Sequence, residues 1–197
     1  MGISPRQFEQ MQERVSGKKR SAEKAPVEPL AHKVVIGIDP SLRGTGYGVI
    51  RFGGSGPKAE AQGTVKCGPK LERSRCLYEI SSTIREVVRK HQPTVCAIEG
   101  LFYAQNVKTT LTMGEARGAA LAVLAESGLE IFEIAPRKVK QSIVGYGNAQ
   151  KIAVAKMVQR MLTLKELPAP DAADALALAL TFVHLHKRFA IDPAQKI

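Results

Sequence analysis

Three strand-like runs joined by very short links constrain the fold of this chain more than any other feature. The runs cover residues 34–39, 46–52 and about 61–67, and clusters of Gly and Pro at 40–46 and 53–57 supply the turns between them. Because links this short cannot carry the chain back across a sheet, neighbouring strands must run antiparallel. The globular part therefore begins as an antiparallel three-stranded sheet.

Helical and strand-like segments alternate after residue 70. Apolar residues at helical spacing predict an amphipathic helix over 71–91, and Pro93 separates it from a fourth strand at 94–99. The next segments read as helix, strand and three helices, over about 107–127, 129–134, 136–144, 149–163 and 171–188. This alternation adds βαβ crossovers to the antiparallel start. The sequence predicts an α/β fold, a mixed five-stranded sheet with helices on both faces.

The first 32 residues differ in composition from the rest of the chain. Gln, Glu, Lys, Arg and Ser dominate them, so we expect residues 1–32 to be a mostly disordered basic arm. The chain of 197 residues with 44% hydrophobic content suffices for one full-sized core. We therefore expect one folded domain over 33–190 and a short C-terminal tail over 191–197.

Charge and cysteine usage narrow the range of partners and compartments. The formal net charge of +11 favours a polyanionic partner, although solubility alone would also explain it. Cys67, Cys76 and Cys96 are odd in number and lack metal-ligand spacing, which indicates a reduced cytoplasmic setting. No apolar run approaches the roughly 18 residues of a membrane span. We expect a cytoplasmic protein that binds nucleic acid and no membrane.

Four carboxylates stand beside apolar segments, where a charge loses hydration and needs a partner. Asp39 and Glu99 end strand-like runs, and Asp171 and Asp174 open the last helix. Each alone has a simpler explanation, since strand-end acids are commonly solvated and Asp171 after Pro170 is a good N-cap. Together they can converge at one edge of the sheet. Four carboxylates suit two Mg²⁺ or Mn²⁺ ions, a pair that can hydrolyse a phosphodiester.

The glycine-rich stretch over 39–48 raises the alternative of a phosphate-binding turn. A dinucleotide-binding fingerprint requires a helix directly after the glycines, whereas residues 47–52 have the pattern of a strand. The P-loop pattern is absent from the sequence. We therefore interpret this stretch as a tight hairpin that begins with an acid.

Five strings occur in order over about residues 33–188: IGIDPSLRGTGYGVI, AIEGLFYAQN, MGEARGAAL, VKQSIVGYGNAQK and DAADALALAL. With them the chain resembles the bacterial RuvC-type Holliday junction resolvases, of the ribonuclease-H-like superfamily. The resemblance implies a ribonuclease-H-like fold and a homodimeric endonuclease of recombination and repair. Such an enzyme nicks two opposed strands of four-way junction DNA symmetrically, leaving 5′-phosphate and 3′-hydroxyl ends. A branch-migration helicase complex is an implied further partner.

The resemblance also assigns roles to individual residues. The catalytic acids, which would hold two Mg²⁺ ions with Mn²⁺ as a substitute, fall on Asp39, Glu99, Asp171 and Asp174. The DNA-binding positions fall on one loop and one basic stretch: Phe102, Tyr103, Asn106, Arg137, Lys138, Lys140 and Lys151. The aromatic Phe102 either stacks on a base or fills a hydrophobic gap. Many family members have Gly where this chain has Ser41, so the turn after Asp39 can differ in shape.

Two other classes of function stay open at this point. A sugar-kinase or actin-like ATPase also begins with a strand that ends in Asp before a glycine-rich hairpin, but it needs two such lobes, and this chain has room for one. A non-catalytic DNA-binding module would use the acids only as caps or as ligands of a structural ion. The small residues of the helix at 107–127 suit either a subunit contact or a core helix.

Overall fold

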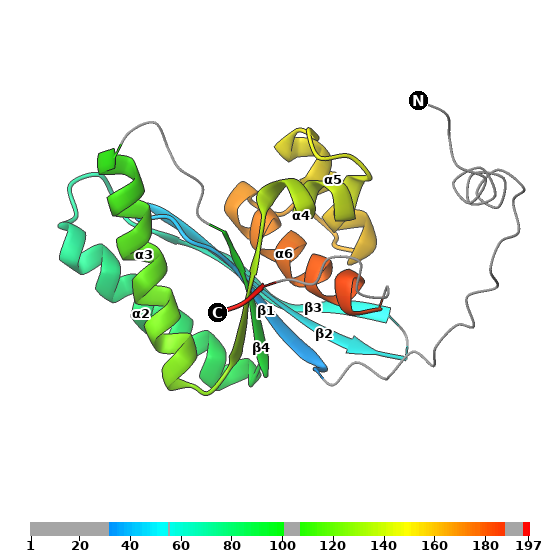
Figure 1. Ribbon diagram of the computed structural model, residues 1–197, viewed down its shortest axis with the longest axis horizontal. Coiled ribbons are helices and arrows are strands. Elements are labelled where there is room, and N and C mark those ends of the chain that lie inside the picture. Colours follow the sequence, from blue (N-terminus) through cyan, green and yellow to red (C-terminus); the bar gives the residue numbers. More distant parts are fainter. Residues whose placement is uncertain (1–31, 55, 101–106, 188–194) are drawn as a thin grey trace, which may run out of the picture.

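The structure, a computed structural model, describes residues 32–54, 56–100, 107–187 and 195–197 (Figure 1). Within these ranges one sheet contains six strands in the order β3-β2-β1-β4-β5-β6. The strands are β1 Val34–Asp39, β2 Gly44–Gly53, β3 Gly56–Lys66, β4 Val95–Glu99, β5 Glu130–Ile134 and β6 Gln195–Lys196. The predicted arm lies outside the described residues except for His32, as does most of the predicted C-terminal tail.

The strand directions confirm the predicted mixed sheet. β1 pairs antiparallel with β2 and β2 with β3, whereas β1 pairs parallel with β4 and β4 with β5. The predicted number of strands was wrong, because β6 adds a sixth, antiparallel to β5. Its two residues are too few to show a strand period in the sequence. The backbone N–H of Ile197 extends this edge by donating to the Ile131 carbonyl at 3.0 Å.

Helices cover both faces of the sheet, as the sequence predicted. They are α2 Arg73–His91, α3 Val107–Glu126, α4 Pro136–Val144, α5 Lys151–Met161 and α6 Pro170–Lys187. Figure 1 shows α2 and α3 on one face and α4, α5 and α6 on the other. In the described part of the chain, no helix has both the length and the apolar content that crossing a membrane requires.

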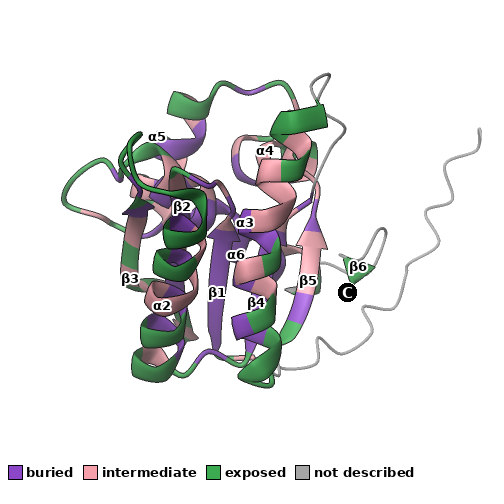
Figure 2. Ribbon diagram, turned by 90° about the vertical axis from the view of Figure 1, so that its left-hand side faces the viewer, coloured by how far each residue is buried: buried purple, intermediate pink, exposed green. Residues whose placement is uncertain are grey.

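The central strands β1 and β4 are buried on both faces, as their colour in Figure 2 shows. Side chains alternate between the two faces of a strand. Ile36 and Ile38 accordingly join the core under α2 and α3, whereas Val35 joins the core under α6. In β4, likewise, Ile98 joins the core under α2 and α3, whereas Ala97 joins the core under α6. The last residue of each strand therefore faces α6.

Glycines in β1 and β2 let α6 approach the sheet at backbone distance. A Cβ on Gly37 would lie 1.9 Å from the carbonyl oxygen of Ala175 in α6. A Cβ on Gly48 would lie 2.7 Å from the Leu176 side chain. Only glycine leaves this space free. The turn is shorter than the predicted 40–46, since it spans only 40–43 and Gly44 already lies inside β2.

Candidate active site

Asp39 and Glu99 lie side by side at the ends of two neighbouring strands. The parallel register of β1 and β4 pairs Ile38 with Ile98, so the next residue of each strand reaches the same edge of the sheet. Their carboxyl groups are hydrogen-bonded to each other. Because a carboxylate only accepts, this bond requires a proton on one of the two groups. The predicted convergence of these two acids is therefore present in the fold.

Asp174 faces this pair from α6, and its charge acts on both strand-end acids. The Nζ of Lys151, the first residue of α5, donates a hydrogen bond of 2.6 Å to Asp174 Oδ2. The lysine side chain is 71% exposed, whereas that of the aspartate is 19% exposed. A solvent-accessible ammonium thus neutralises a mostly buried carboxylate.

The surroundings of Asp39 and Glu99 disfavour the negative charge of these two carboxyl groups. Burial raises the pKa of Asp39 to about 8, the charges of Glu99 and Asp174 raise it further, and Lys151 lowers it in part. Burial also raises the pKa of Glu99, against the hydrogen bond with Asp39 and the positive charge of Lys140. The hydrogen bond to Asp174 raises the pKa of Lys151. Because buried carboxylates lie close together with little water to stabilise their charge, the site attracts cations.

Asp171 lies somewhat apart from the other three acids. It is the second residue of α6, which begins at Pro170, so the N-cap role considered from the sequence is wrong. Its carboxylate lies over β2, where a Cβ on Gly44 would stand 3.0 Å from Asp171 Oδ2. Its backbone lies over Gly46, which is the register partner of Asp39. The first turn of α6 thus places this acid one strand away from Asp39.

The donor set fits a hard divalent cation, although its ligands are not yet gathered around one point. Among the described residues, no three His, Cys, Asp or Glu side chains already form an arrangement that could hold a metal ion. The carboxyl groups of Asp39 and Glu99 interact with each other, and the ammonium of Lys151 binds Asp174. Carboxylate oxygens are the ligands that Mg²⁺ prefers. The residues fit the ion, and the metal site stays a prediction.

The hydroxyl group of Thr45 fixes the turn that follows Asp39. This fully buried side chain donates to the Ser41 carbonyl at 2.6 Å and accepts from the Ser41 N–H at 3.2 Å. In the described ranges, Gln92 and Thr163 alone among non-glycine residues have a positive φ. Ser41 therefore adopts its backbone conformation in this turn without left-handed strain.

The residues predicted to bind DNA are distributed unevenly around the acids. Phe102, Tyr103 and Asn106 lie outside the described residues. Lys140 and Lys151 border the site, since the first acts on Glu99 and the second binds Asp174. Arg137 and Lys138 belong to α4, and the Arg137 side chain packs over Gly147, where a Cβ would lie 2.6 Å from its Cγ.

Sequence reasoning missed one pair of charged residues behind the site. Arg117 of α3 is only 7% exposed, and its Nη2 pairs with Glu133 of β5. Its Nη1 donates to the backbone carbonyl of Glu99 at 3.4 Å. The available signal was an arginine in an alanine-rich helix and an acid inside a short strand, each of which interrupts an apolar pattern.

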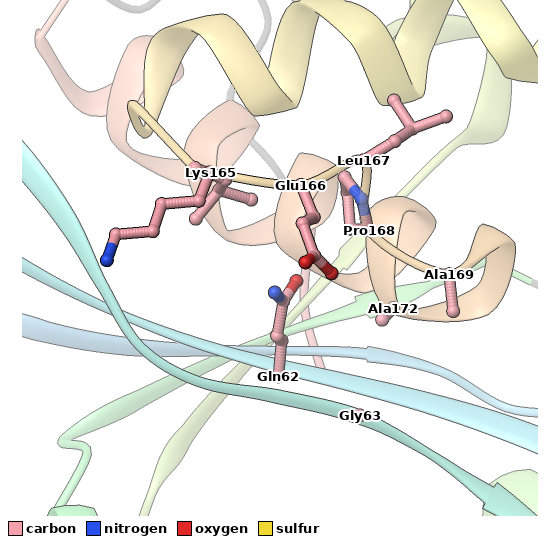
Figure 3. A pocket seen from close by; sticks show the side chains of 9 residues that line it. Gln62, Gly63, Lys165, Glu166, Leu167, Pro168, Ala169 and Ala172 are labelled. Carbon is pink, nitrogen blue, oxygen red and sulfur yellow. The ribbon is translucent and has the colours of Figure 1, made fainter.

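A groove of about 480 Å³ lies between β3 and the connection from α5 to α6 (Figure 3). Gln62 and Glu166 point toward each other across it, and Ala172, in the first turn of α6, also lines it. None of the four acids lines this groove. The candidate active site therefore lies outside this groove, at the strand ends.

The family model described as crossover junction endodeoxyribonuclease RuvC matches residues 35–182, which include all four acids. The chain belongs to the RuvC family. RuvC of Hahella chejuensis is 46% identical over 152 residues, covering 76% of this chain and 87% of that protein. RuvC of Bordetella avium is 46% identical over 150 residues, covering 76% and 83%. The resemblance stated from the sequence is confirmed.

Solved structures agree with this family assignment. T. thermophilus RuvC, in complex with Holliday junction substrate, superposes with a TM-score of 0.76 at 33% identity, covering 84% of this chain and 100% of that one. The yeast mitochondrial Holliday junction resolvase superposes with a TM-score of 0.56 at 13% identity, a likeness of fold alone. The ribonuclease-H-like α/β architecture predicted from the sequence is confirmed.

Proposed function

We propose that this protein is a structure-specific endonuclease that resolves four-way DNA junctions by paired, symmetric nicks in recombination and repair. The observation that carries the proposal is the juxtaposition of Asp39, Glu99 and Asp174 at the sheet edge of a RuvC-family chain. Buried carboxyl groups with raised pKa values, here those of Asp39 and Glu99, are unfavourable for stability and mark functional sites. The net charge of +11 suits a DNA partner of opposite charge.

The four acids hold two Mg²⁺ ions, and Mn²⁺ substitutes for them. Asp39 and Glu99 contribute ligands from the strand ends, and Asp171 and Asp174 contribute them from α6. Bound ions supply activation of a water molecule and stabilisation of the departing 3′ oxygen. Because cleavage occurs at the bond between phosphorus and that oxygen, the ends are a 5′-phosphate and a 3′-hydroxyl that a ligase can rejoin.

Basic residues around the acids orient the scissile strand. The Nζ of Lys151 ends a long and mostly exposed side chain, so it can turn from Asp174 to a phosphate oxygen. Lys140 lies close enough to Glu99 to act on its pKa, and Arg137 and Lys138 extend the positive surface along α4. Phe102, Tyr103 and Asn106 follow Glu99 within seven residues of the sequence, and we propose them as further DNA contacts because aromatic side chains can stack on unpaired bases.

A homodimer with two-fold symmetry puts one site on each of two opposed strands. The outer side of α3 is the proposed interface, because Val107 and Leu111 are 73% and 63% exposed there. Gly118 of the same helix is exposed, and a Cβ on it would have no atom within 4 Å. Ala116 and Ala120 on the opposite side of α3 are buried in the core. The helix thus serves as both core element and contact surface. The protein works in the cytoplasm with a branch-migration helicase complex.

A synthetic four-way junction incubated with the protein and Mg²⁺ tests the proposal, with linear duplex DNA of the same sequence as control. We expect symmetric nicks on the junction alone. Asp39→Asn, Glu99→Gln and Asp174→Asn should each abolish nicking and keep junction binding. Glu86→Gln, at an exposed position of α2, is the matched control and should cut like the wild type. Equal cutting of the duplex, or wild-type nicking by Glu99→Gln, would refute the proposal.

A further inference from the structure

We propose that Arg117 positions Glu99 for metal binding by holding its backbone from the opposite face of the sheet, with Glu133 as the anchor of the guanidinium group. The inference rests on the proposed function, because it takes Glu99 to be a metal ligand. Arg117 is a positioning residue in this proposal, since it touches neither the metal nor the DNA.

The burial of Arg117 requires an explanation. Of the residues that the structure describes, it alone combines a charged side chain with near-complete burial. A buried guanidinium is costly unless charge and hydrogen-bond partners compensate it. Glu133 supplies the charge through Nη2, and the carbonyl of Glu99 accepts from Nη1 at 3.4 Å. The two acceptors occupy two different nitrogens of the same planar group.

The location of these contacts links them to the active site. Glu133 pairs with Ile98 in the β4–β5 register and faces α3, on the side of the sheet away from α6. Glu99 is the last residue of β4, one position beyond the last β1–β4 partner pair. Its side chain faces α6, while Arg117 holds its carbonyl from behind. The pairing of β4 with β1 ends at Ile98. The last residue of β4, Glu99, is therefore held only by β5 and by Arg117 of α3 among these neighbours.

Fixing this carbonyl sets the direction of the Glu99 side chain. A metal ligand works only when it is held within about 0.5 Å of its productive position. The planar guanidinium has donors on several nitrogens and can hold two acceptors at a fixed separation. Lysine concentrates its donors on one nitrogen and cannot reproduce that geometry. The chemistry of the position therefore requires arginine and not merely a positive charge.

Arg117→Lys and Arg117→Gln test the proposal against Arg85→Gln as the matched control. Arg85 also binds a glutamate of α3, with Nη2 at 3.1 Å from Glu126 Oε2, but both side chains are more than half exposed. Three quantities are measured: the Mg²⁺ concentration for half-maximal nicking, the rise in melting temperature that Mn²⁺ causes without DNA, and junction affinity without metal.

We expect both Arg117 variants to need about 10- to 100-fold more Mg²⁺, as loss of the group that orients a metal ligand does elsewhere. The rise in melting temperature should require correspondingly more Mn²⁺, and junction affinity without metal should equal that of the wild type. Arg85→Gln should match the wild type in all three measurements. A positioning role predicts this metal-dependent pattern, whereas a purely structural role would lower stability and leave the metal requirement unchanged.

Glu133→Gln provides a second route if Arg117→Gln does not fold, because it weakens the anchor and keeps the arginine. Folded Arg117→Lys and Glu133→Gln with wild-type requirements for both ions would overturn the inference. The Glu99→Gln variant distinguishes a failure of this inference from a failure of the proposed function. Wild-type nicking by Glu99→Gln refutes the metal site itself, whereas inactive Glu99→Gln beside an unaffected Arg117→Lys refutes only the positioning role.

Discussion

Gly46 and Asp171 are in backbone contact, since a Cβ on Gly46 would lie 2.0 Å from the carbonyl oxygen of Asp171. Replacing this glycine with alanine must displace the first turn of α6, because neither backbone can yield locally. We expect Gly46→Ala to lower the free energy of unfolding by about 3 kcal/mol or more, as overpacking does. It should also impair nicking at temperatures where the variant is folded. Urea unfolding and the junction assay measure the two effects.

Gly53→Ala is the matched control for this prediction. Gly53 lies in the same strand, and a Cβ there would meet no atom within 4 Å. This variant should unfold within about 0.5 kcal/mol of the wild type, as surface substitutions usually do. Equal stability of Gly46→Ala and Gly53→Ala would contradict the close approach of α6 to β2.

Asp39→Asn should stabilise the metal-free protein while it abolishes nicking. The pKa of Asp39 rises from its ordinary value of 3.8 to about 8 on folding, so the folded state binds a proton more tightly than the unfolded chain does. Ionisation of Asp39 therefore lowers the free energy of unfolding. This loss is absent below about pH 4, grows as the pH rises and is complete above about pH 8. The variant avoids this loss and should exceed the wild type by roughly 2 kcal/mol or more at pH 7.

Unfolding measured in EDTA from pH 4 to pH 9 checks this prediction. The advantage of Asp39→Asn should widen as the pH rises and level off above pH 8. Mg²⁺ should stabilise the wild type and not the variant. A constant difference between the two proteins across this range would mean that the carboxyl group carries no such cost.

Lys151→Ala should weaken junction binding through the loss of one phosphate contact. The slope of log K against log salt concentration should fall in magnitude by about one. Lys156 is an exposed lysine of the same helix that the site does not include, and Lys156→Ala is the control. Equal salt dependence of the two variants would place Lys151 outside the DNA contact. Fluorescence anisotropy with a labelled junction and no divalent metal gives both slopes.

Gly118→Gln should separate subunit association from folding. The position has room for a side chain within one subunit, so the glutamine costs nothing there and improves helix propensity. In a dimer formed across α3, the same side chain would hold the subunits apart. We expect a folded monomer that binds the junction weakly and no longer makes paired nicks. Sedimentation measures the mass, and Gly54→Gln, at another unobstructed exposed glycine, should remain dimeric.

The sequence predicted the elements of this fold well because their signals are local. Apolar runs and short links indicated β1 to β3, and helical spacing placed each helix within two residues of its observed ends. Asp39 and Glu99 could be paired in advance, since the crossover rule makes β1 and β4 neighbours and each run ends in its acid. Local pattern and chain topology together were therefore sufficient to predict that Asp39 and Glu99 lie side by side in the candidate site.

Features that depend on contacts between distant segments were not predictable in this way. Gly46 belongs to a cluster typical of turns, and only the docking of α6, more than 120 residues later, shows that it is a packing position. The Arg117–Glu133 pair needs the face of α3 and the register of β5 to be known at once. Asp171 shifted from cap to first turn because helix ends are fixed by packing as well as by local residues.

The dependence of the site on α6 has a consequence for the protein during its synthesis. Strands β1 to β5 and their first two acids leave the ribosome well before residue 170. A nascent or prematurely terminated chain of that length lacks two of the four carboxylates, together with the helix that covers the glycines of β1 and β2. Such a fragment carries basic surface and the first two acids but lacks a complete site. We therefore expect a chain that ends before α6 to be unable to nick DNA.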